Sequence, residues 1–206
     1  MSEERYDELS RREILRNIGL GLTLTAGGAD LLSAQAAQHV HQAVAEQKKS
    51  GPYKPKCFTA HEYRTLQKLA DLIVPADEKS KGAIEAGAPE FIDLLASNNA
   101  DLAAIFTGGL AWMDREMERR HKANFVSATP EQQTALLDAI AYRKNDAPEI
   151  APGIRFFAWA RNMTVDAFYT SRTGVDDLGY KGNGSMSEFS VPEEAIQYAL
   201  RRSNLA

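Results

Sequence analysis

The side chains best suited to acid–base or metal chemistry are four histidines and one cysteine, and their spacing argues against a shared site. His39 and His41 are two residues apart, so they cannot lie on one face of a helix. His61 and His121 are isolated, and no histidine has a cysteine or carboxylate at the spacing of zinc ligands. Cys57 alone cannot hold an iron–sulfur cluster, and no C-x-x-C-H haem motif occurs. The sequence therefore predicts no metal site in this chain.

Motifs for nucleotide binding and nucleophilic catalysis are also absent from the sequence. There is no P-loop and no G-x-S-x-G nucleophile elbow, and the glycines near Gly19 do not spell G-x-G-x-x-G. Asp176 and Asp177 lie in a segment rich in glycine and serine, where we expect solvated carboxylates. We accordingly assign no catalytic residue and no cofactor-binding residue to this chain.

The first 36 residues have the features of an export signal. Ser10-Arg11-Arg12 opens the stretch SRREILR, and a weakly apolar run from Ile18 to Leu32 follows it. Ala34-Gln35-Ala36 then places small residues around a polar one, the pattern that a signal peptidase cleaves. The arginine pair resembles the consensus of twin-arginine signals, with an amphipathic surface helix as the alternative interpretation. Twin-arginine cargo crosses the membrane folded and often carries a cofactor, so we expect a cofactor-bearing partner for this chain.

Bulk composition restricts the class of protein further. The chain has 206 residues, 44% of them hydrophobic, which is typical of a globular domain. Its formal net charge of -4 and its pI of about 5.6 argue against a nucleic-acid partner, which would require a basic surface. No run of apolar residues is long and clean enough for a stable transmembrane helix.

Helical signals dominate the remainder and predict an all-α protein. We expect a polar linker with a helical start over 37–57, and one small domain of five or six helices over 58–206. Thr59 and Thr129 each begin a capping box, and Pro89 and Pro152 suit the first turn of a helix. Residues 169–190 are rich in glycine, serine and aspartate, and we predict a long irregular segment there, of the kind that is often functional.

Four pieces of the sequence, taken in order, resemble the gluconate 2-dehydrogenase subunit 3 family. They are F-T-x-x-E from Phe58, D-L-I-V-P at 71–75, E-A-G-A-P-E-F-I-D at 85–93, and F-Y-T-S…L-G-Y-x-G-N over 168–183. They belong to two longer stretches, 58–95 and 156–183, that look like this family, and the twin-arginine leader is a further point of resemblance. The resemblance implies a small helical subunit of a periplasmic, membrane-associated dehydrogenase. It also implies a catalytic partner of the glucose-methanol-choline (GMC) type that holds FAD, and often a cytochrome c subunit that takes the electrons.

We therefore interpret the chain as a non-catalytic subunit of a periplasmic flavin-dependent sugar, glycoside or polyol dehydrogenase. In that family the small subunit supports maturation of the catalytic subunit and carries its twin-arginine signal, so the translocase is a further partner. The alternatives are a stand-alone periplasmic enzyme, against which the missing acid–base groups argue, and a helical ligand-binding module. Candidate interface residues are Cys57, an unpaired thiol or small buried apolar group, and the aromatic residues Tyr169, Tyr180 and Phe189.

Overall fold

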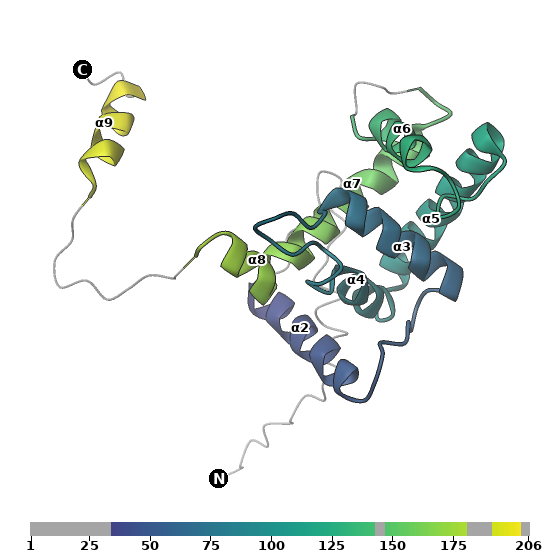
Figure 1. The fold of residues 1–206 in the computed structure, drawn as a ribbon, viewed down its shortest axis with the longest axis horizontal. Coiled ribbons are helices and arrows are strands. Elements are labelled where there is room, and N and C mark those ends of the chain that lie inside the picture. The colour runs from purple at the N-terminus through teal and green to yellow at the C-terminus, as the bar shows by residue number, and fades with distance from the viewer. Residues whose placement is uncertain (1–33, 143–146, 181–190, 203–206) are drawn as a thin grey trace, which may run out of the picture.

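Every regular element in the described part of the chain is a helix, which confirms the predicted all-α fold. The computed structural model describes residues 34–142, 147–180 and 191–202. These ranges hold eight helices, of which seven begin after residue 58, where five or six were predicted (Figure 1). They are α2 (Ala34–Lys49), α3 (Ala60–Ile73), α4 (Ala88–Ala96), α5 (Ala100–His121), α6 (Pro130–Ile140), α7 (Ala151–Tyr169), α8 (Arg172–Asp177) and α9 (Glu193–Arg202).

The centre of the domain is built from α4 and α7. Helix α7 contacts α3, α4, α5, α6 and α8, whereas α4 contacts α2, α3, α5 and α7. Every residue of α4 is buried, including the two acidic ones, because neighbouring helices surround it (Figure 1). A helix enclosed in this way must satisfy its charged side chains internally, since water does not reach them.

Two glycines let α5 and α7 approach closely. A Cβ atom on Gly109 of α5 would lie 2.0 Å from Cδ2 of Phe156 on α7. In the reverse direction, a Cβ atom on Gly153 of α7 would lie 2.2 Å from the ring of Trp112 on α5. Each aromatic ring therefore fills the space that a missing side chain leaves on the facing helix, and this fixes the register of the two helices.

The predicted helix starts are confirmed in detail. The Thr59 hydroxyl accepts from the backbone N–H of Glu62 at 3.3 Å, and the Glu62 carboxylate accepts from the Thr59 N–H at 2.8 Å. Thr129 and Gln132 form the second capping box, at the start of α6. Pro89 lies in the first turn of α4 behind Gly87, whose φ of 79° is a conformation that glycine adopts without strain.

The polar linker predicted over 37–57 differs most from the structure. Its first part belongs to α2, and Ala37, Val40 and Val44 of this helix are buried in the core. These three positions form one stripe on a helix that is otherwise polar, so its average composition hides the packing face. Lys48, near the end of α2, forms a 2.6 Å ion pair with Glu90 of α4. The packed body of the protein therefore begins well before residue 58.

The segment predicted to be irregular from residue 169 also begins with regular structure. Helix α7 continues to Tyr169, and α8 covers 172–177. The short last helix predicted after Pro192 is confirmed as α9, none of whose residues is buried. Ser10, Arg11, Arg12 and Phe189 lie outside the described residues. Within the described ranges, none of the helices is both long enough and apolar enough to span a membrane.

Candidate partner interface

The end of α7 and the whole of α8 form a tightly bonded corner. The Ser171 hydroxyl donates to the carbonyl of Phe168 at 2.6 Å and accepts from the N–H of Gly174 at 3.1 Å, which caps α8. A Cβ atom on Gly174 would lie 2.2 Å from the carbonyl oxygen of Phe168, so only glycine permits this approach. The F-Y-T-S motif is therefore a rigid helix-to-helix connection.

The L-G-Y motif ends this corner with a Schellman turn. Gly179 has a φ of 61°, and its N–H donates to the carbonyl of Asp176 at 3.0 Å. The N–H of Tyr180 donates to the carbonyl of Val175 at 3.3 Å, which completes the pair of bonds that define the motif. These bonds fix the backbone position of Tyr180, although this residue lies after the end of α8.

The corner presents four large apolar side chains to solvent. Leu178 and Tyr180 are 62% and 64% exposed, and Val165 and Tyr169 are exposed one turn apart on α7. We call Val165, Tyr169, Leu178 and Tyr180 the corner residues. Tyr169 also meets the edge of the buried Phe168 ring, with 4.9 Å between ring centroids, so the α7 end of this group is attached to the core. Exposed aromatic side chains on a well-ordered backbone are typical anchors of protein interfaces.

A half-buried carboxylate lies beside the corner residues. Asp166 follows Val165 on α7 and is half-buried. Its side chain has no hydrogen bond or ion pair with any other described residue, and burial raises its pKa above the ordinary aspartate value. A desolvated carboxylate of this kind favours the approach of a cation, and a partner could supply a lysine or arginine here.

His41 of α2 connects the corner to the N-terminal part of the domain. The Thr170 hydroxyl donates to the carbonyl of Asp166 at 2.7 Å, so it accepts from Nε2–H of His41 at 3.0 Å. The imidazole also packs on Phe91, with 4.8 Å between centroids, and burial lowers its pKa. This histidine is therefore a structural link between α2 and α7.

Cys57 lies in a separate region that one buried carboxylate organises. Asp93 of α4 accepts from the consecutive N–H groups of Lys56, Cys57 and Phe58 at 2.8, 3.0 and 3.1 Å. It also accepts from the Tyr53 hydroxyl at 2.7 Å. Asp93 is fully buried, and these donors replace the water that it has lost. The connection between α2 and α3 is therefore clamped onto α4.

The chemistry of Cys57 follows from this clamp. Its thiol is half-buried against the core, and burial, together with the nearby carboxylates of Asp93 and Glu62, raises its pKa to about 11. A thiol with this pKa stays protonated near neutral pH and is a weak nucleophile. In Figure 1 the start of α3, which Cys57 precedes, lies on the opposite side of the domain from α8, so the structure does not bring Cys57 together with Tyr169 and Tyr180.

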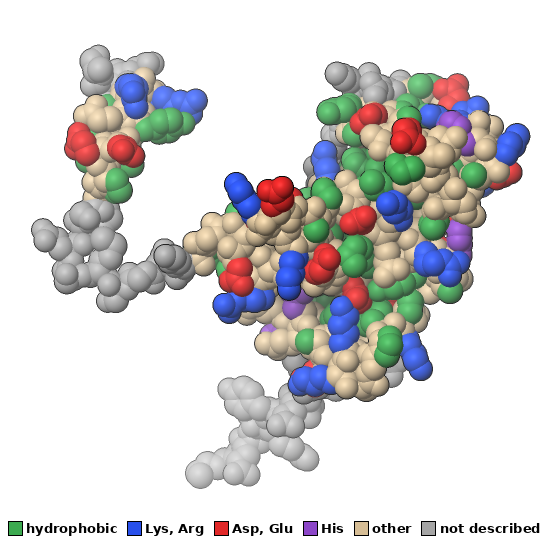
Figure 2. Space-filling view, in the orientation of Figure 1, with side chains coloured by type: hydrophobic (Ala, Val, Ile, Leu, Met, Phe, Trp, Pro, Cys, Tyr) green, Lys and Arg blue, Asp and Glu red, His purple; other side chains and the backbone are tan. Residues whose placement is uncertain are grey.

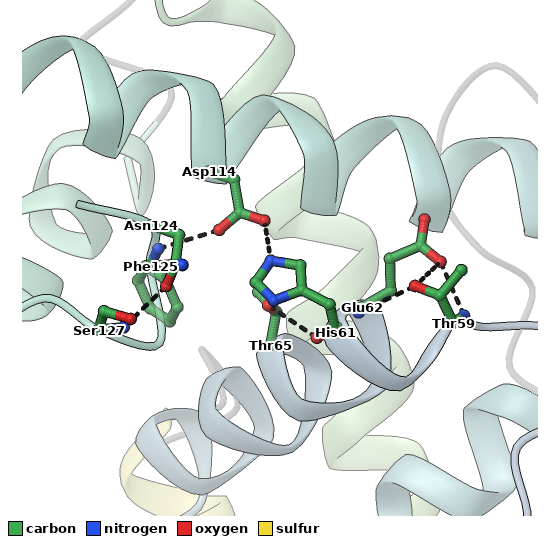
Figure 3. Close-up of polar contacts among 8 residues, drawn as sticks. All are labelled: Thr59, His61, Glu62, Thr65, Asp114, Asn124, Phe125 and Ser127. Carbon is green, nitrogen blue, oxygen red and sulfur yellow. Dashed lines mark hydrogen bonds and ion pairs between the residues drawn. The ribbon is translucent and has the colours of Figure 1, made fainter. Parts of the chain in front are cut away.

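The partly exposed pair of His61 and Asp114 also has a structural role. Nε2 of His61 lies 2.6 Å from one carboxylate oxygen of Asp114, and the other oxygen accepts from the N–H of Phe125 at 2.9 Å (Figure 3). The nearby Thr65 hydroxyl donates to the His61 carbonyl within the same helix, so it is not poised as a nucleophile for the imidazole (Figure 3). The pair joins α3, α5 and the turn before α6.

The described residues contain no cluster of metal ligands, and one face of the protein shows no dominant patch of charge. No three histidine, cysteine, aspartate or glutamate side chains in these ranges are grouped as metal ligands would be. On the face shown in Figure 2, positive and negative side chains are interspersed. The described residues thus form a helical domain whose α7–α8 corner exposes aromatic side chains.

Comparison with known families makes this assignment specific. The pattern of the gluconate 2-dehydrogenase subunit 3 family matches residues 60–184, more than half of the chain, and the chain belongs to this family. The family name makes it the accessory subunit of a dehydrogenase complex. No curated protein and no solved structure was found to match the chain.

The family motifs contain residues whose structural roles were not predicted from the sequence. Glu90 and Asp93, in the E-A-G-A-P-E-F-I-D motif, hold Lys48 and the connection before α3. Both acids lie within an otherwise apolar helix, and that position was the available signal that they are buried and paired. Three partners of Asp93 could not be found from the sequence, because Lys56, Cys57 and Phe58 contribute backbone groups rather than side chains.

Proposed function

We propose that this chain is the non-catalytic small subunit of a periplasmic, FAD-dependent sugar, glycoside or polyol dehydrogenase. In this proposal a GMC-type catalytic subunit binds FAD and oxidises the substrate, and a cytochrome c subunit accepts the electrons. The small subunit supports maturation of its partner and carries the twin-arginine signal, through Ser10, Arg11 and Arg12, for both proteins. The observation that carries the proposal is the corner, whose aromatic side chains are exposed inside the segment that matches the family.

The corner supplies both apolar aromatic area and a partly desolvated charge, which together favour a strong protein interface. Tyr169 and Tyr180 offer large apolar area with little side-chain entropy to lose, since each has only two rotatable bonds. Asp166 offers a partly desolvated charge beside them, for which part of the desolvation cost has already been met during folding. We therefore expect the catalytic subunit to present a lysine or arginine surrounded by apolar side chains.

Affinity measurements on the complex test this proposal. The tagged chain is co-expressed with a GMC-type flavoprotein from the same genome, and binding of the purified subunits is measured. Tyr180→Ala and Asp166→Asn should each weaken assembly by about 1–2 kcal/mol, or roughly 5–30-fold in Kd. Tyr142→Ala is the matched control, because Tyr142 is also exposed but lies beyond α6, away from the corner.

Two results would contradict the proposal. Unchanged affinity in both corner variants, with circular dichroism showing intact helices, would remove the corner from the interface. Flavin absorbance or dye-linked sugar oxidation by the purified chain alone would show that it is an enzyme. Failure to capture a flavoprotein, together with direct sugar binding by this chain, would favour the ligand-binding module instead.

A further inference from the structure

The predicted signal-peptidase motif coincides with the start of helix α2. Helix α2 begins at Ala34, so Ala34-Gln35-Ala36 forms its first turn. The bond that the peptidase would hydrolyse joins Ala36 to Ala37, and Ala37 is fully buried in the core. Val40, one turn further on, is fully buried as well. The residue immediately after the bond is therefore a core residue and not part of an exposed connection.

Cleavage at this bond requires α2 to open. Susceptibility of a peptide bond to proteolysis depends on whether its backbone is free of hydrogen bonds and packing, and a helical turn fixed to the core is neither. The opened state must unwind the first turns of α2 and expose Ala37, and its population falls with the free energy of that local unfolding.

Contacts further along α2 resist this opening. His41 is hydrogen-bonded to Thr170 at 3.0 Å and packs on Phe91. Lys48, at the other end of the helix, is paired with the buried Glu90 at 2.6 Å. The helix is therefore attached to both α4 and the α7–α8 corner, and unwinding its start competes with these interactions.

The order of the segments along the chain also bears on whether the peptidase can reach the Ala36–Ala37 bond. The glycine- and proline-containing connection, 50–59, follows α2 and does not separate the leader from the folded body. A twin-arginine cargo folds before it crosses the membrane, so the peptidase would meet α2 after it has packed. We propose that the packing of α2 protects the Ala36–Ala37 bond from signal peptidase, so that the exported chain keeps its leader.

The retained leader keeps its apolar run attached to the folded part of the exported subunit. Water does not add across the Ala36–Ala37 bond, so the apolar run from Ile18 to Leu32 stays covalently joined to α2. The exported subunit then carries this run as part of its mature chain. This inference rests on the proposed export signal, but not on the corner or on the flavoprotein.

An assay with purified components tests the inference without the translocase or the partner. Full-length chain in detergent is incubated with bacterial signal peptidase, and the products are identified by intact mass. A variant with a flexible glycine–serine spacer of about ten residues after Ala36 moves the motif away from the packed helix. Val44→Asp places a charge on the buried face of α2, and Gln42→Asp, on the exposed face of the same helix, is its control.

The spacer variant should be cleaved about 100-fold faster than the native chain or more, because proteolysis follows the population of the opened state. Val44→Asp should also be cleaved faster, whereas Gln42→Asp should resemble the native chain. If Val44→Asp fails to fold, the spacer variant still decides the matter. Rapid cleavage of the native chain after Ala36 would overturn the inference, and so would resistance of the spacer variant, since α2 would then not be the cause.

Discussion

Replacing Gly109 with alanine tests how closely α5 packs on α7, and the neighbouring Gly108 provides a control in the same helix. The new Cβ atom would lie 2.0 Å from Cδ2 and 2.1 Å from Cγ of Phe156, distances at which something must move. The Phe156 ring is itself buried, and it packs edge-on against Phe106 with 5.7 Å between centroids. We expect overpacking to cost about 1–3 kcal/mol, offset by up to about 1 kcal/mol from the better helix propensity of alanine.

Gly108 is the matched control, because it lies next to Gly109 in the same helix and a Cβ atom placed on it would meet no atom within 4 Å. Gly108→Ala should stabilise the protein by about 0.5–1 kcal/mol through helix propensity alone. Urea denaturation followed by circular dichroism measures both variants. The double variant Gly109→Ala with Phe156→Leu should recover part of the loss, because the smaller side chain leaves room. If Gly109→Ala is as stable as Gly108→Ala, the proposed interlocking of the two helices is wrong.

Three further predictions concern the buried carboxylates and the leader. Asp93→Asn should destabilise the chain by about 1.5–3 kcal/mol in urea denaturation, because an amide nitrogen cannot accept from the N–H groups of 56–58; stability equal to the parent would show that the clamp is not needed. The Glu116 pKa is lowered from 4.5 to about 2 by Arg119 and Arg120, so its stabilising contribution is complete above pH 4.5 and is lost as the pH falls towards 2. Glu116→Gln should therefore remove about 1 kcal/mol at pH 6 and little at pH 2, the arginines being partly screened by solvent; an equal loss at both pH values would contradict this. Arg11→Lys with Arg12→Lys keeps the charge but not the guanidinium geometry, so both this chain and its flavoprotein partner should stay in the cytoplasm on fractionation; normal periplasmic dehydrogenase activity would exclude shared export.

The two proposals make different demands on the same domain. If the corner binds the catalytic subunit, its exposed aromatic side chains must stay accessible until assembly. If the leader is retained, the start of α2 must stay packed after export. His41 and Thr170 connect the two regions, so the stability of α2 and the geometry of the corner are expected to change together.

The sequence by itself determined the features that depend on neighbours within a few residues. The capping boxes at Thr59 and Thr129 join groups three residues apart, and Pro89 sets the first turn of α4 through its own ring. These local rules were sufficient for the all-α fold and for most helix starts. The order of the family motifs was likewise sufficient to identify the family, because it needs no knowledge of how the pieces pack.

Only the tertiary structure decided what those helices bury and which residues meet. His41 and Thr170 are 129 residues apart, and Asp93 accepts from groups 35 to 37 residues away, so no local pattern predicts either contact. The same reason explains why α2 was predicted to be part of a linker. Its stripe of Ala37, Val40 and Val44 is small and weakly apolar, and it becomes a packing face only because α4 and the rest of the core provide a surface that fits it.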